Sequence, residues 1–289
     1  MTRVQPFNRA VVEEFRANAG QVGGMFEGGD LLLLTTVGAR TGVEQTSPLG
    51  YVRDGDRIFV IGSAAGGPRH PAWYHNLLAH PMVRVELGTE TFGAIAVPAE
   101  GAERDRLFAL AVAAAPGYAE YQEKTDRVLP VVTLEGRFVD EPVASFADML
   151  LRVHTWLRDQ LRHVRAETEA HFAGERAAGV PLGLQIRQHC LALCQGLEMH
   201  HKGEDAGLLP GMRERYPELG DAIDRLVAEH RVVAGIQEKL VRLLDDVATA
   251  DPETFRVALD RLSDELLAHL AYEEQTLLPL LGGAPGAAS

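Results

Sequence analysis

The sequence predicts two domains of different class: an α+β barrel-like domain in residues 1–140, followed by an all-α, up-down four-helix bundle in residues 145–283. Strand candidates joined by glycine turns fill the first half, whereas long segments with an apolar residue every three or four positions fill the second. A length of 289 residues and an apolar fraction of 46% are enough for two ordinary cores. We expect the linker near Glu141 and Pro142.

The overall charge excludes several classes of partner. Forty-one acidic residues against 28 basic ones give a net charge of −13, which argues against binding to nucleic acid and to anionic membrane surfaces. No signal-like segment opens the sequence, and the longest apolar run, near residues 31–34, is too short to span a bilayer. We therefore expect a soluble, cytoplasmic protein. Cys190 and Cys194 lie one helical turn apart and are interpreted as reduced, buried residues, with a redox pair as the alternative.

The four expected helices of the second half each carry one histidine on an otherwise apolar face. Two of these histidines are followed by glutamate at i+4. A single such pair would fit a core histidine hydrogen-bonded to its neighbour, but four in succession argue against that interpretation. The four stripes are Leu150, His154, Leu157, Leu161 and Val164; Leu193, Leu197, His200, Glu204 and Leu208; Ile223, Leu226, His230, Val233 and Gln237; and Leu262, Leu266, His269, Glu273 and Leu277.

These polar side chains have the chemistry of a metal centre. A buried ionised carboxylate is costly unless a cation compensates it. Four imidazoles and two carboxylates that converge inside a bundle form a ligand set for two transition-metal ions, with the glutamates bridging. The combination suits iron or manganese, and the absence of thiolates argues against a structural zinc site.

About residues 146–282 resemble a hemerythrin-type (HHE) four-helix bundle, which holds a non-haem di-iron centre. The His-His-x-x-Glu-Asp element at 200–205 and the His-x-x-x-Glu element at 269–273 carry the resemblance. It implies that His154 and His200 bind one iron, that His230 and His269 bind the other, and that Glu204 and Glu273 bridge them. Oxygen-carrying hemerythrins have a further histidine where Ala234 stands. The smaller ligand set leaves coordination sites open, which favours redox chemistry or sensing over reversible oxygen carriage.

The remaining polar residues of the bundle are expected to play supporting roles. His201 lies one step round the helix from His200 and is interpreted as orienting a ligand rather than as a ligand. Asp205 and Glu274, each adjacent to a bridging glutamate, are expected to hydrogen-bond ligand imidazoles. The histidines that lie off the stripes, expected at the surface or at its boundary, are His163, His171 and His189.

The first half reads as antiparallel strands with helices outside them, which predicts the barrel-like α+β domain. Asp54-Gly55 and Gly88 mark hairpin turns, and Pro71 begins a helix. Helices are expected at 9–19, 71–79 and 103–114, and strands at 31–37, 46–53, 57–62, 83–87, 90–97 and 129–134.

Three segments of this half look suited to a ligand. The Gly38–Gly42 turn, with Arg40, would offer backbone N–H groups to a phosphate, although an ordinary hairpin turn is the preferred interpretation. Pro48 cannot pair normally within a strand, so we expect an edge or a break there. The small residues of Ser63–Gly67 would let a flat ring approach the main chain closely.

About residues 28–135 resemble the deazaflavin-dependent nitroreductase family, whose split β-barrel binds coenzyme F420. The matching elements are Leu-Thr-Thr-Val-Gly-Ala-Arg-Thr-Gly (34–42), Ser-Pro-Leu (47–49), Arg-Asp-Gly-Asp-Arg (53–57), Pro-Ala-Trp-Tyr-His-Asn-Leu (71–77) and Tyr-Ala-Glu-Tyr-Gln-Glu-Lys-Thr-Asp-Arg (118–127). The resemblance implies that Arg40 and Thr41 meet the cofactor's phosphate and polyglutamate tail, and that Tyr118 and Tyr121 cap the substrate side as catalytic residues. The ring system would be lined by Ser47, Pro48, Leu49, Ser63, Ala64, Ala72, Trp73 and Asn76.

The departures from this family are electrostatic. Family members often carry a second basic residue beside Arg40, one near Gln45, and a lysine at the position of Ala64. Each lost cation weakens binding of the polyanionic tail by about 1 kcal/mol. Compensation by Arg53 or Arg69, or use of a less charged flavin such as FMN, are the alternatives. Homologous barrels often pair through their sheets, so we also expect a homodimer.

The leading hypothesis is an oxidoreductase in which the barrel uses reduced deazaflavin (F420H2) and the bundle handles dioxygen or a related small oxidant at di-iron. A deazaflavin delivers two electrons at once whereas iron accepts one at a time, so direct transfer needs an intermediary or a flavin that splits the pair. The alternative is a protein that binds or senses iron, oxygen or nitric oxide, whose barrel binds a cofactor or reduces a separate quinone- or nitro-type substrate. A bundle that serves only for oligomerisation is disfavoured, because buried ionisable groups are costly.

Overall fold

The computed structural model describes residues 2–138, 144–173, 183–245 and 252–281. The chain divides into two compact units, Met1–Asp140 and Glu141–Ser289. The expected linker at Glu141 and Pro142 lies outside the described residues.

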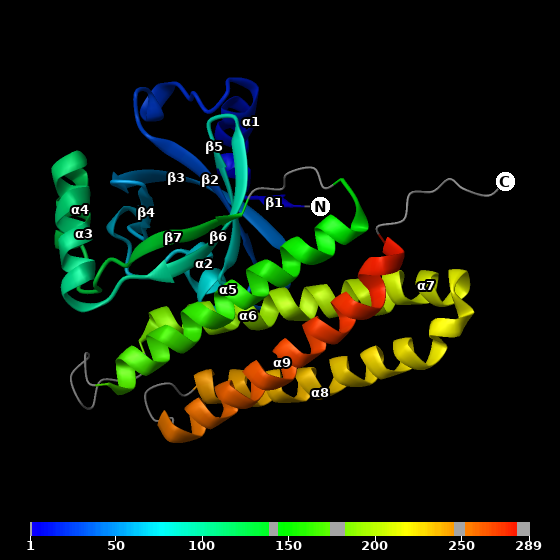
Figure 1. Ribbon diagram of the computed structural model, residues 1–289. Coiled ribbons are helices and arrows are strands. Elements are labelled where there is room, and N and C mark those ends of the chain that lie inside the picture. Colours follow the sequence, from blue (N-terminus) through cyan, green and yellow to red (C-terminus); the bar gives the residue numbers. More distant parts are fainter. Residues whose placement is uncertain (1, 139–143, 174–182, 246–251, 282–289) are drawn as a thin grey trace. The chain divides into compact units, whose positions relative to one another are not determined.

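The first unit is a β-barrel with helices on its outside (Figure 1). The described strands form one sheet in the order β1-β3-β2-β5-β6-β7-β4, and β4 also pairs with β3, so strands β2 to β7 close on themselves and β1 adds to β3 in parallel. The strands are β1 (Arg3–Val4), β2 (Leu31–Val37), β3 (Glu44–Asp54), β4 (Arg57–Ile61), β5 (Met82–Leu87), β6 (Glu90–Pro98) and β7 (Val131–Phe138). The helices are α1 (Arg9–Ala17), α2 (Ala72–Ala79), α3 (Gly101–Ala114) and α4 (Gly117–Glu123), with short 3-10 turns η1 (Pro6–Asn8), η2 (Gly24–Phe26) and η3 (Ala64–Gly66).

The continuous leucine run at the start of β2 is explained by burial on both faces of the sheet. Leu32 and Leu34 point into the barrel interior, while Leu31 and Leu33 pack under α1. A strand covered on both sides loses the usual alternation of apolar and polar residues. The α+β barrel expected from the sequence is confirmed.

Pro48 lies inside β3, opposite Leu33 of β2. On the other side of β3, β1 pairs only with Gln45 and Thr46, and pairing with β4 begins at Tyr51. Among the described residues, no strand therefore pairs with residues 47–50 on that side. The expected local edge is confirmed, and it leaves main-chain groups of this segment outside the hydrogen-bond ladder.

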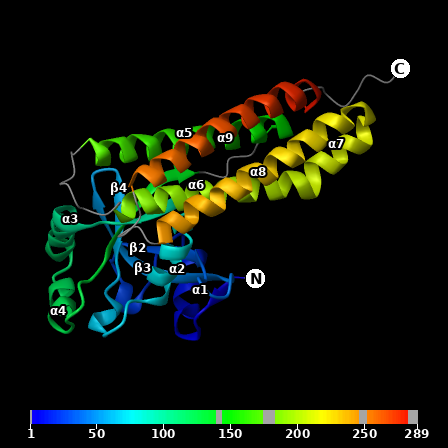
Figure 2. The ribbon, with the colours of Figure 1, turned by 90° about the horizontal axis from the view of Figure 1, so that it is seen from below.

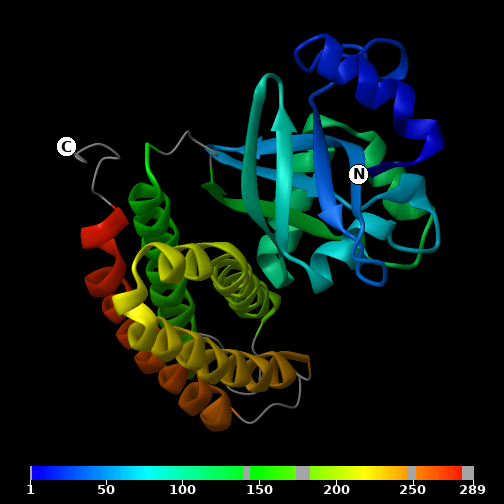
Figure 3. The same ribbon diagram turned by 90° about the vertical axis from the view of Figure 1, so that its right-hand side faces the viewer.

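The second unit is an up-down bundle of four long helices, seen in Figure 2 and obliquely from one end in Figure 3. Helix α5 packs against α6 and α9, and α8 packs against the same two helices. The helices are α5 (Phe146–Phe172), α6 (Leu184–Gly203), α7 (Leu209–Arg215), α8 (Gly220–Asp245) and α9 (Pro252–Leu281), with a π-helical turn η4 (Glu204–Leu208) and a 3-10 turn η5 (Pro217–Leu219). Ser145 caps α5 by accepting a hydrogen bond from the backbone N–H of Asp148.

The four predicted stripes face the bundle interior, with one correction. Leu208 was expected to continue the stripe of Glu204, but it is only partly buried, and Leu209 is 1% exposed instead. The cause is the π-helical turn between α6 and α7, which inserts an extra residue into the turn and so shifts the buried face by one position.

Apolar layers enclose the polar residues of the stripes on both sides along the bundle. One large cluster includes Leu157, Leu197, Val233 and Leu266, and a second includes Leu277. Water is therefore largely excluded from the space between them. Among the described residues, no helix has both the length and the apolar character needed to cross a membrane.

A substitution at Gly196 of α6 tests how closely this helix packs against α5. A Cβ there would lie 2.2 Å from Cζ3 of the Trp156 ring, so Gly196→Ala should lower the free energy of unfolding of the bundle by about 1–3 kcal/mol. The matched control is Gly235→Ala in α8, where a Cβ would meet nothing within 4 Å, and which should raise stability by about 0.5–1 kcal/mol. Denaturant unfolding followed by circular dichroism measures both. Equal shifts in the two variants would contradict the close approach of α5 and α6.

Candidate metal centre and cofactor site

The six predicted metal ligands converge in the bundle interior, together with His201. One group comprises His154 of α5, His200 of α6, Glu204 and Glu273, and a second comprises His201, His230 and His269. Within each group the candidate ligand atoms lie within 4.8 Å of one another. All of these side chains are buried except that of His200, which is partly buried.

The two glutamates lie between the two histidine groups. Oε1 of Glu204 is 3.3 Å from Nδ1 of His200, while its Oε2 is 3.5 Å from Nε2 of His230. Glu273 places Oε2 3.3 Å from Nε2 of His154 and 3.6 Å from Nε2 of His269. Donor atoms that share one cation at about 2.0–2.2 Å are themselves separated by roughly 3–3.5 Å. The carboxylates therefore have the placement expected of bridging ligands.

Carboxylates outside this cluster fix the orientation of three imidazoles. Nδ1 of His154 is 2.8 Å from Glu274 Oε1, and Nδ1 of His230 is 2.8 Å from Asp205 Oδ1, so the roles expected of Glu274 and Asp205 are borne out by these contacts. The sequence reasoning missed Glu229, whose Oε2 lies 3.0 Å from Nδ1 of His269. Each contact engages Nδ1 and directs Nε2 toward the centre.

Arginines hold two of these outer carboxylates from the bundle surface. Arg158 donates to Glu274 over 2.7 Å, and Arg225 donates to Glu229 over 2.7 Å. Burial opposes ionisation of Glu274, but the hydrogen bonds and positive charges of Arg158 and His154 together outweigh it and lower the pKa of that carboxyl. The same balance, with His269 and Arg225 as donors, lowers the pKa of Glu229. Both carboxylates are therefore ionised acceptors for the imidazole N–H groups.

Buried polar atoms without a protein partner show that the cluster fits a cation. Among the described residues they include Nε2 of His201, His230 and His269 and both carboxylate oxygens of Glu204 and Glu273. Burial, followed by the adjacent Glu273, raises the pKa of Glu204 well above its usual value. Burial lowers the pKa of His200 to about 3 and that of His201 to about 2, so both rings are neutral near pH 7 and able to bind metal.

Other sulfur and imidazole groups of the bundle lie outside the cluster. Cys190 and Cys194 are free and buried among apolar residues, and burial raises the pKa of Cys194 to about 12, so these thiols are poor ligands. His189 was expected at the surface or its boundary, but it is buried, with its ring 4.2 Å from that of His163. Its position off the predicted stripe did not imply exposure, because α6 is buried on more than one face.

In the barrel, the Gly38–Gly42 turn uses most of its N–H groups in its own hydrogen bonds, and so does not form the phosphate cradle considered as the alternative. Its own atoms accept most of them: Gly38 N–H donates to Val43 O, Thr41 and Gly42 N–H donate to Gly38 O, and Val43 N–H donates to Thr41 Oγ1. Oδ1 of Asn76 accepts the N–H of Ala39. The preferred interpretation as an ordinary turn is therefore correct, and the side chain of Arg40 extends exposed from it.

Two predicted ring-lining residues of α2, Asn76 and Trp73, make contacts within the barrel. Asn76 accepts from Ala39 and donates Nδ2 to Thr36 Oγ1, so it ties α2 to β2 and to the following turn. Trp73 is 6% exposed and belongs to the interior cluster of the barrel. The adjacent Ala72 is exposed. On β3, the candidates Ser47, Pro48 and Leu49 are partly buried along the segment that lacks a strand partner on one side.

The loop after β4 is held by Arg127, which the sequence reasoning did not identify. Its guanidinium donates to the carbonyls of Gly62, Ser63 and Gly67 over 2.6–3.0 Å. In this loop Ala64 and Ala65 have φ values of 45° and 52°, which are unfavourable for residues other than glycine. The clamp supports this conformation, which exposes the candidate Ala64, while Ser63 is partly buried.

The two candidate tyrosines lie beside this loop. A Cβ on Gly66 would come within 3.0 Å of the Tyr121 carbonyl, so η3 packs closely on α4. The ring of Tyr118 packs edge-on against that of Tyr121, with centroids 6.4 Å apart. The Tyr118 hydroxyl lies 3.2 Å from the position that a Cβ on Gly50 would occupy. The fold thus brings α4, the Ser63–Gly66 loop and the Pro48 segment of β3 together.

Basic residues near the predicted tail site come from an unexpected strand. Arg3 of β1 pairs with Gln45 of β3, which places an exposed cation beside Gln45. Arg53 lies near the other end of β3 from the Gly38–Gly42 turn, at a rise of about 3.3 Å per residue, and cannot supplement Arg40 there.

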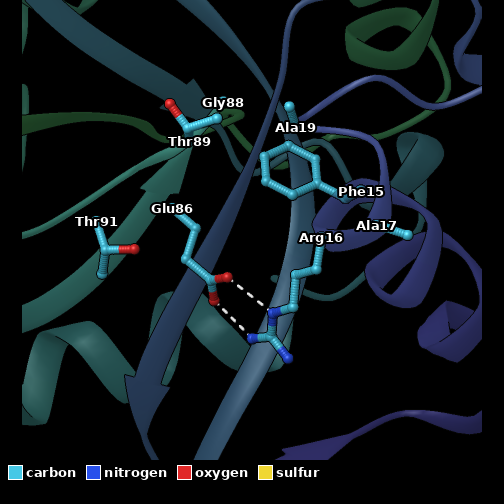
Figure 4. Close-up of a pocket in the computed structure, with 8 residues that line it drawn as sticks. All are labelled: Phe15, Arg16, Ala17, Ala19, Glu86, Gly88, Thr89 and Thr91. Carbon is cyan, nitrogen blue, oxygen red and sulfur yellow. Dashed lines mark hydrogen bonds and ion pairs between the residues drawn. The ribbon is translucent and has the colours of Figure 1, made fainter.

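A cavity of about 390 Å³ lies between α1 and the β5–β6 turn, and it contains none of the predicted cofactor residues (Figure 4). Arg16 and Glu86 form a paired hydrogen bond across it, at 2.7 and 2.6 Å. Because each of these charges is neutralised by the other, this cavity is a weaker candidate than the loop at Ser63–Gly67.

Replacing the outer carboxylate of His269 should weaken metal binding. In Glu229→Gln the amide can no longer act as a charged acceptor, and the affinity for metal should fall about 10–100-fold. The control is Glu238→Gln on the same helix, because Glu238 is exposed and faces Arg242. Competition with a chelator measures both affinities, and equal affinities would show that Glu229 does not orient a ligand.

Removal of the Arg127 clamp should loosen the loop after β4. Arg127→Ala loses the hydrogen bonds to three carbonyls, so amide hydrogen exchange at residues 62–67 should accelerate at least tenfold. Arg69→Ala, an exposed arginine beside the same loop, is the matched control and should leave the exchange unchanged. Unaltered protection in Arg127→Ala would contradict the assigned role.

Comparison with known proteins agrees with both halves of this description. A family model described as F420H(2)-dependent quinone reductase matches residues 7–136, and one described as hemerythrin HHE cation binding domain matches residues 145–281. An F420H(2)-dependent quinone reductase of Mycobacterium tuberculosis is 39% identical over 127 residues, which cover 43% of this chain and 85% of the relative.

Solved structures match part of the chain. One described as an F420-H2 dependent reductase is 41% identical, with 37% of this chain and 94% of that chain covered and a TM-score of 0.35. Another, described as a domain-swapped dimer, is 36% identical, with 45% and 95% covered and a TM-score of 0.37. By its identity to relatives that it covers almost completely, the chain belongs to the F420H(2)-dependent quinone reductase family, and a hemerythrin HHE cation-binding domain follows in the same chain.

Proposed function

We propose that the chain is an F420H2-dependent oxidoreductase whose barrel reduces a quinone-type acceptor. We further propose that its bundle binds two iron ions and handles dioxygen or another small oxidant. The observation that carries the proposal is the 39% identity over 127 residues to a relative named for F420H2-dependent quinone reduction. Assembly as a homodimer stays a prediction.

The residues gathered in the barrel fit a flat cofactor. The Ser63–Gly66 loop offers small residues and a supported backbone, and residues 47–50 of β3 have main-chain groups outside the strand ladder on one side. The exposed side chains of Arg40 and Arg3 would meet the anionic tail. FMN is the alternative occupant. When bound, F420H2 supplies a hydride.

Conversion of a quinone to a hydroquinone takes one hydride and one proton. The hydride comes from the cofactor, and Tyr118 is the candidate donor of the proton from its hydroxyl oxygen. Burial raises the pKa of Tyr118, so the hydroxyl keeps its proton at neutral pH. The T-shaped contact with Tyr121 orients the ring and limits access of water from that side.

Bound iron would supply one-electron chemistry and binding sites for small oxidants. His154, His200, His230, His269, Glu204 and Glu273 would hold it. A hydride carries two electrons, whereas iron accepts them singly, so direct transfer from the deazaflavin is unfavourable. A hydroquinone gives up its electrons one at a time, and the product of the barrel is therefore chemically suited to act as the intermediary.

The second candidate function is sensing of iron, oxygen or nitric oxide by the bundle. The apolar layers on both sides of the donor atoms support this reading, because they suit capture of a small apolar gas. In this case the barrel would reduce its quinone- or nitro-type substrate independently of the bundle. The two functions differ in whether iron changes the turnover of F420H2.

The test follows oxidation of F420H2 by the full chain, with a soluble quinone such as menadione and with dioxygen supplied separately. Quinone should be reduced without iron, and Tyr118→Phe should slow this step about 100-fold with little change in F420 affinity. No quinone-dependent oxidation in any form of the protein would refute the barrel's proposed activity.

The role of the bundle is tested in the same assay. With limiting quinone and with dioxygen present, F420H2 consumption beyond one equivalent of quinone should be faster with iron-loaded protein than with iron-free protein or Glu204→Ala, in which only the spontaneous reoxidation of the hydroquinone by dioxygen regenerates the quinone. If iron binds but makes no difference, the sensor function is favoured and coupling between the units is refuted.

A further inference from the structure

The imidazole of His201 occupies a place in the metal centre that its sequence position did not suggest. Its ring stacks on that of His230, with centroids 4.0 Å apart and an interplanar angle of 13°. It meets the ring of His269 edge-on, with centroids 5.1 Å apart. The side chain is buried, and Nε2 has no hydrogen-bond partner among the described residues.

This environment does not suit a histidine that merely fills the core. A buried ring nitrogen without a partner loses its hydrogen bond to water and gains nothing in return, at a cost of about 1–3 kcal/mol. The candidate ligand atoms of His201, His230 and His269 lie within 4.8 Å of one another, and the Nε2 atoms of His230 and His269 are likewise without hydrogen-bond partners among the described residues. Three such nitrogens at one place are satisfied together by a single cation.

Adjacent residues of α6 reach different halves of the site. Successive side chains of a helix diverge by about 100°. His200 accordingly faces His154, with their Nε2 atoms 3.0 Å apart, while His201 faces His230 and His269. The π-helical turn begins at the next ligand, Glu204, whose two oxygens reach His200 and His230 respectively. Such turns occur often at functional sites, because they alter which residues share a face.

We propose that His201 is a metal ligand, the third imidazole of the cation held by His230 and His269. The inference rests on the proposed two-cation centre and deepens it. The donor set is then unequal, with three imidazoles at one cation, two at the other, and Glu204 and Glu273 shared. The open coordination position, where a small oxidant or gas binds, belongs to the cation held by His154 and His200.

This ligand set changes the comparison with oxygen-carrying proteins. The position on α8 that would carry their additional histidine is Ala234, which is exposed in this structure. A histidine on that face would not be needed, because α6 supplies the third imidazole from the other side. The argument from a small ligand set, which disfavoured reversible oxygen binding, therefore no longer holds.

The experiment is an anaerobic titration of the metal-free full chain with Co(II), followed by visible absorption, which reports both stoichiometry and coordination number. The test variant is His201→Gln, a neutral side chain that retains packing but is a poor ligand. The matched control is His189→Gln, which removes another buried histidine of the same helix. Thermal unfolding of each metal-free variant checks that the fold is retained.

The wild type and His189→Gln should each take up two Co(II) ions. His201→Gln should bind one with unchanged affinity, and its affinity for the other should fall by more than about 100-fold, beyond the effect of an outer carboxylate. His201→Glu, which restores a donor, should recover much of this loss. The visible absorption of the Co(II) ion that binds more weakly should change as expected when one ligand is lost.

Two outcomes would overturn the proposal, and they differ in what else fails. If the wild type binds two Co(II) ions and His201→Gln binds them with the same affinities and spectrum, His201 is not a ligand although the two-cation centre stands. If the wild type itself does not bind two ions, the proposed centre fails and the inference fails with it.

Discussion

The burial of Glu204 and Glu273 is the constraint around which the bundle is built. The two side chains are 4% and 0% exposed, and their oxygens lie among imidazoles, of which burial keeps those of His200 and His201 neutral. Two carboxylates at such short range inside a low-dielectric interior repel each other unless positive charge lies between them. A bundle of ordinary apolar composition would be more stable without them, so their presence indicates that a cation completes the structure.

The groups around these two carboxylates also favour binding of a cation. Glu274, Asp205 and Glu229 each take an Nδ1 contact from one imidazole, which leaves the Nε2 atoms aimed inward. Arginines at the surface keep two of these acceptors ionised. Apolar layers on either side shield Glu204 and Glu273 from water, so charge at these two residues acts at greater strength than it would in solvent. The orientation of these imidazoles is therefore set by the protein's own side chains.

In the barrel, polar side chains hold irregular backbone segments in place. Asn76 fixes the turn after β2, and Arg127 fixes the loop after β4, each by hydrogen bonds to main-chain atoms. Their observed contacts indicate that they shape the backbone that a cofactor would meet. The two units thus prepare their sites by different means: buried charge in the bundle, and hydrogen bonds to the main chain in the barrel.

Several features could be predicted from sequence because they follow from local periodicity. The strand at Leu31–Val37 has the expected limits, and the histidines and glutamates of the four stripes lie inside the bundle as their spacing of three and four residues requires. Pro48 indicated a local edge because its missing N–H is a property of the residue itself. Short motifs in each half likewise indicated the family resemblances, which are confirmed.

Other features depended on contacts that no spacing rule describes. Glu229 and Arg127 act on residues 40 and 60 positions away or more, so only the folded chain identifies their partners. The π-helical turn shifts the buried face from Leu208 to Leu209. A prediction based on a period of 3.6 residues misses this shift, because it does not include the extra residue. The helical period shows where the side chain of His201 points but not which helices lie opposite, and its contacts with His230 and His269 appear only in the folded chain. The sequence by itself determined which residues form the faces of each element, and the tertiary structure decided which faces meet.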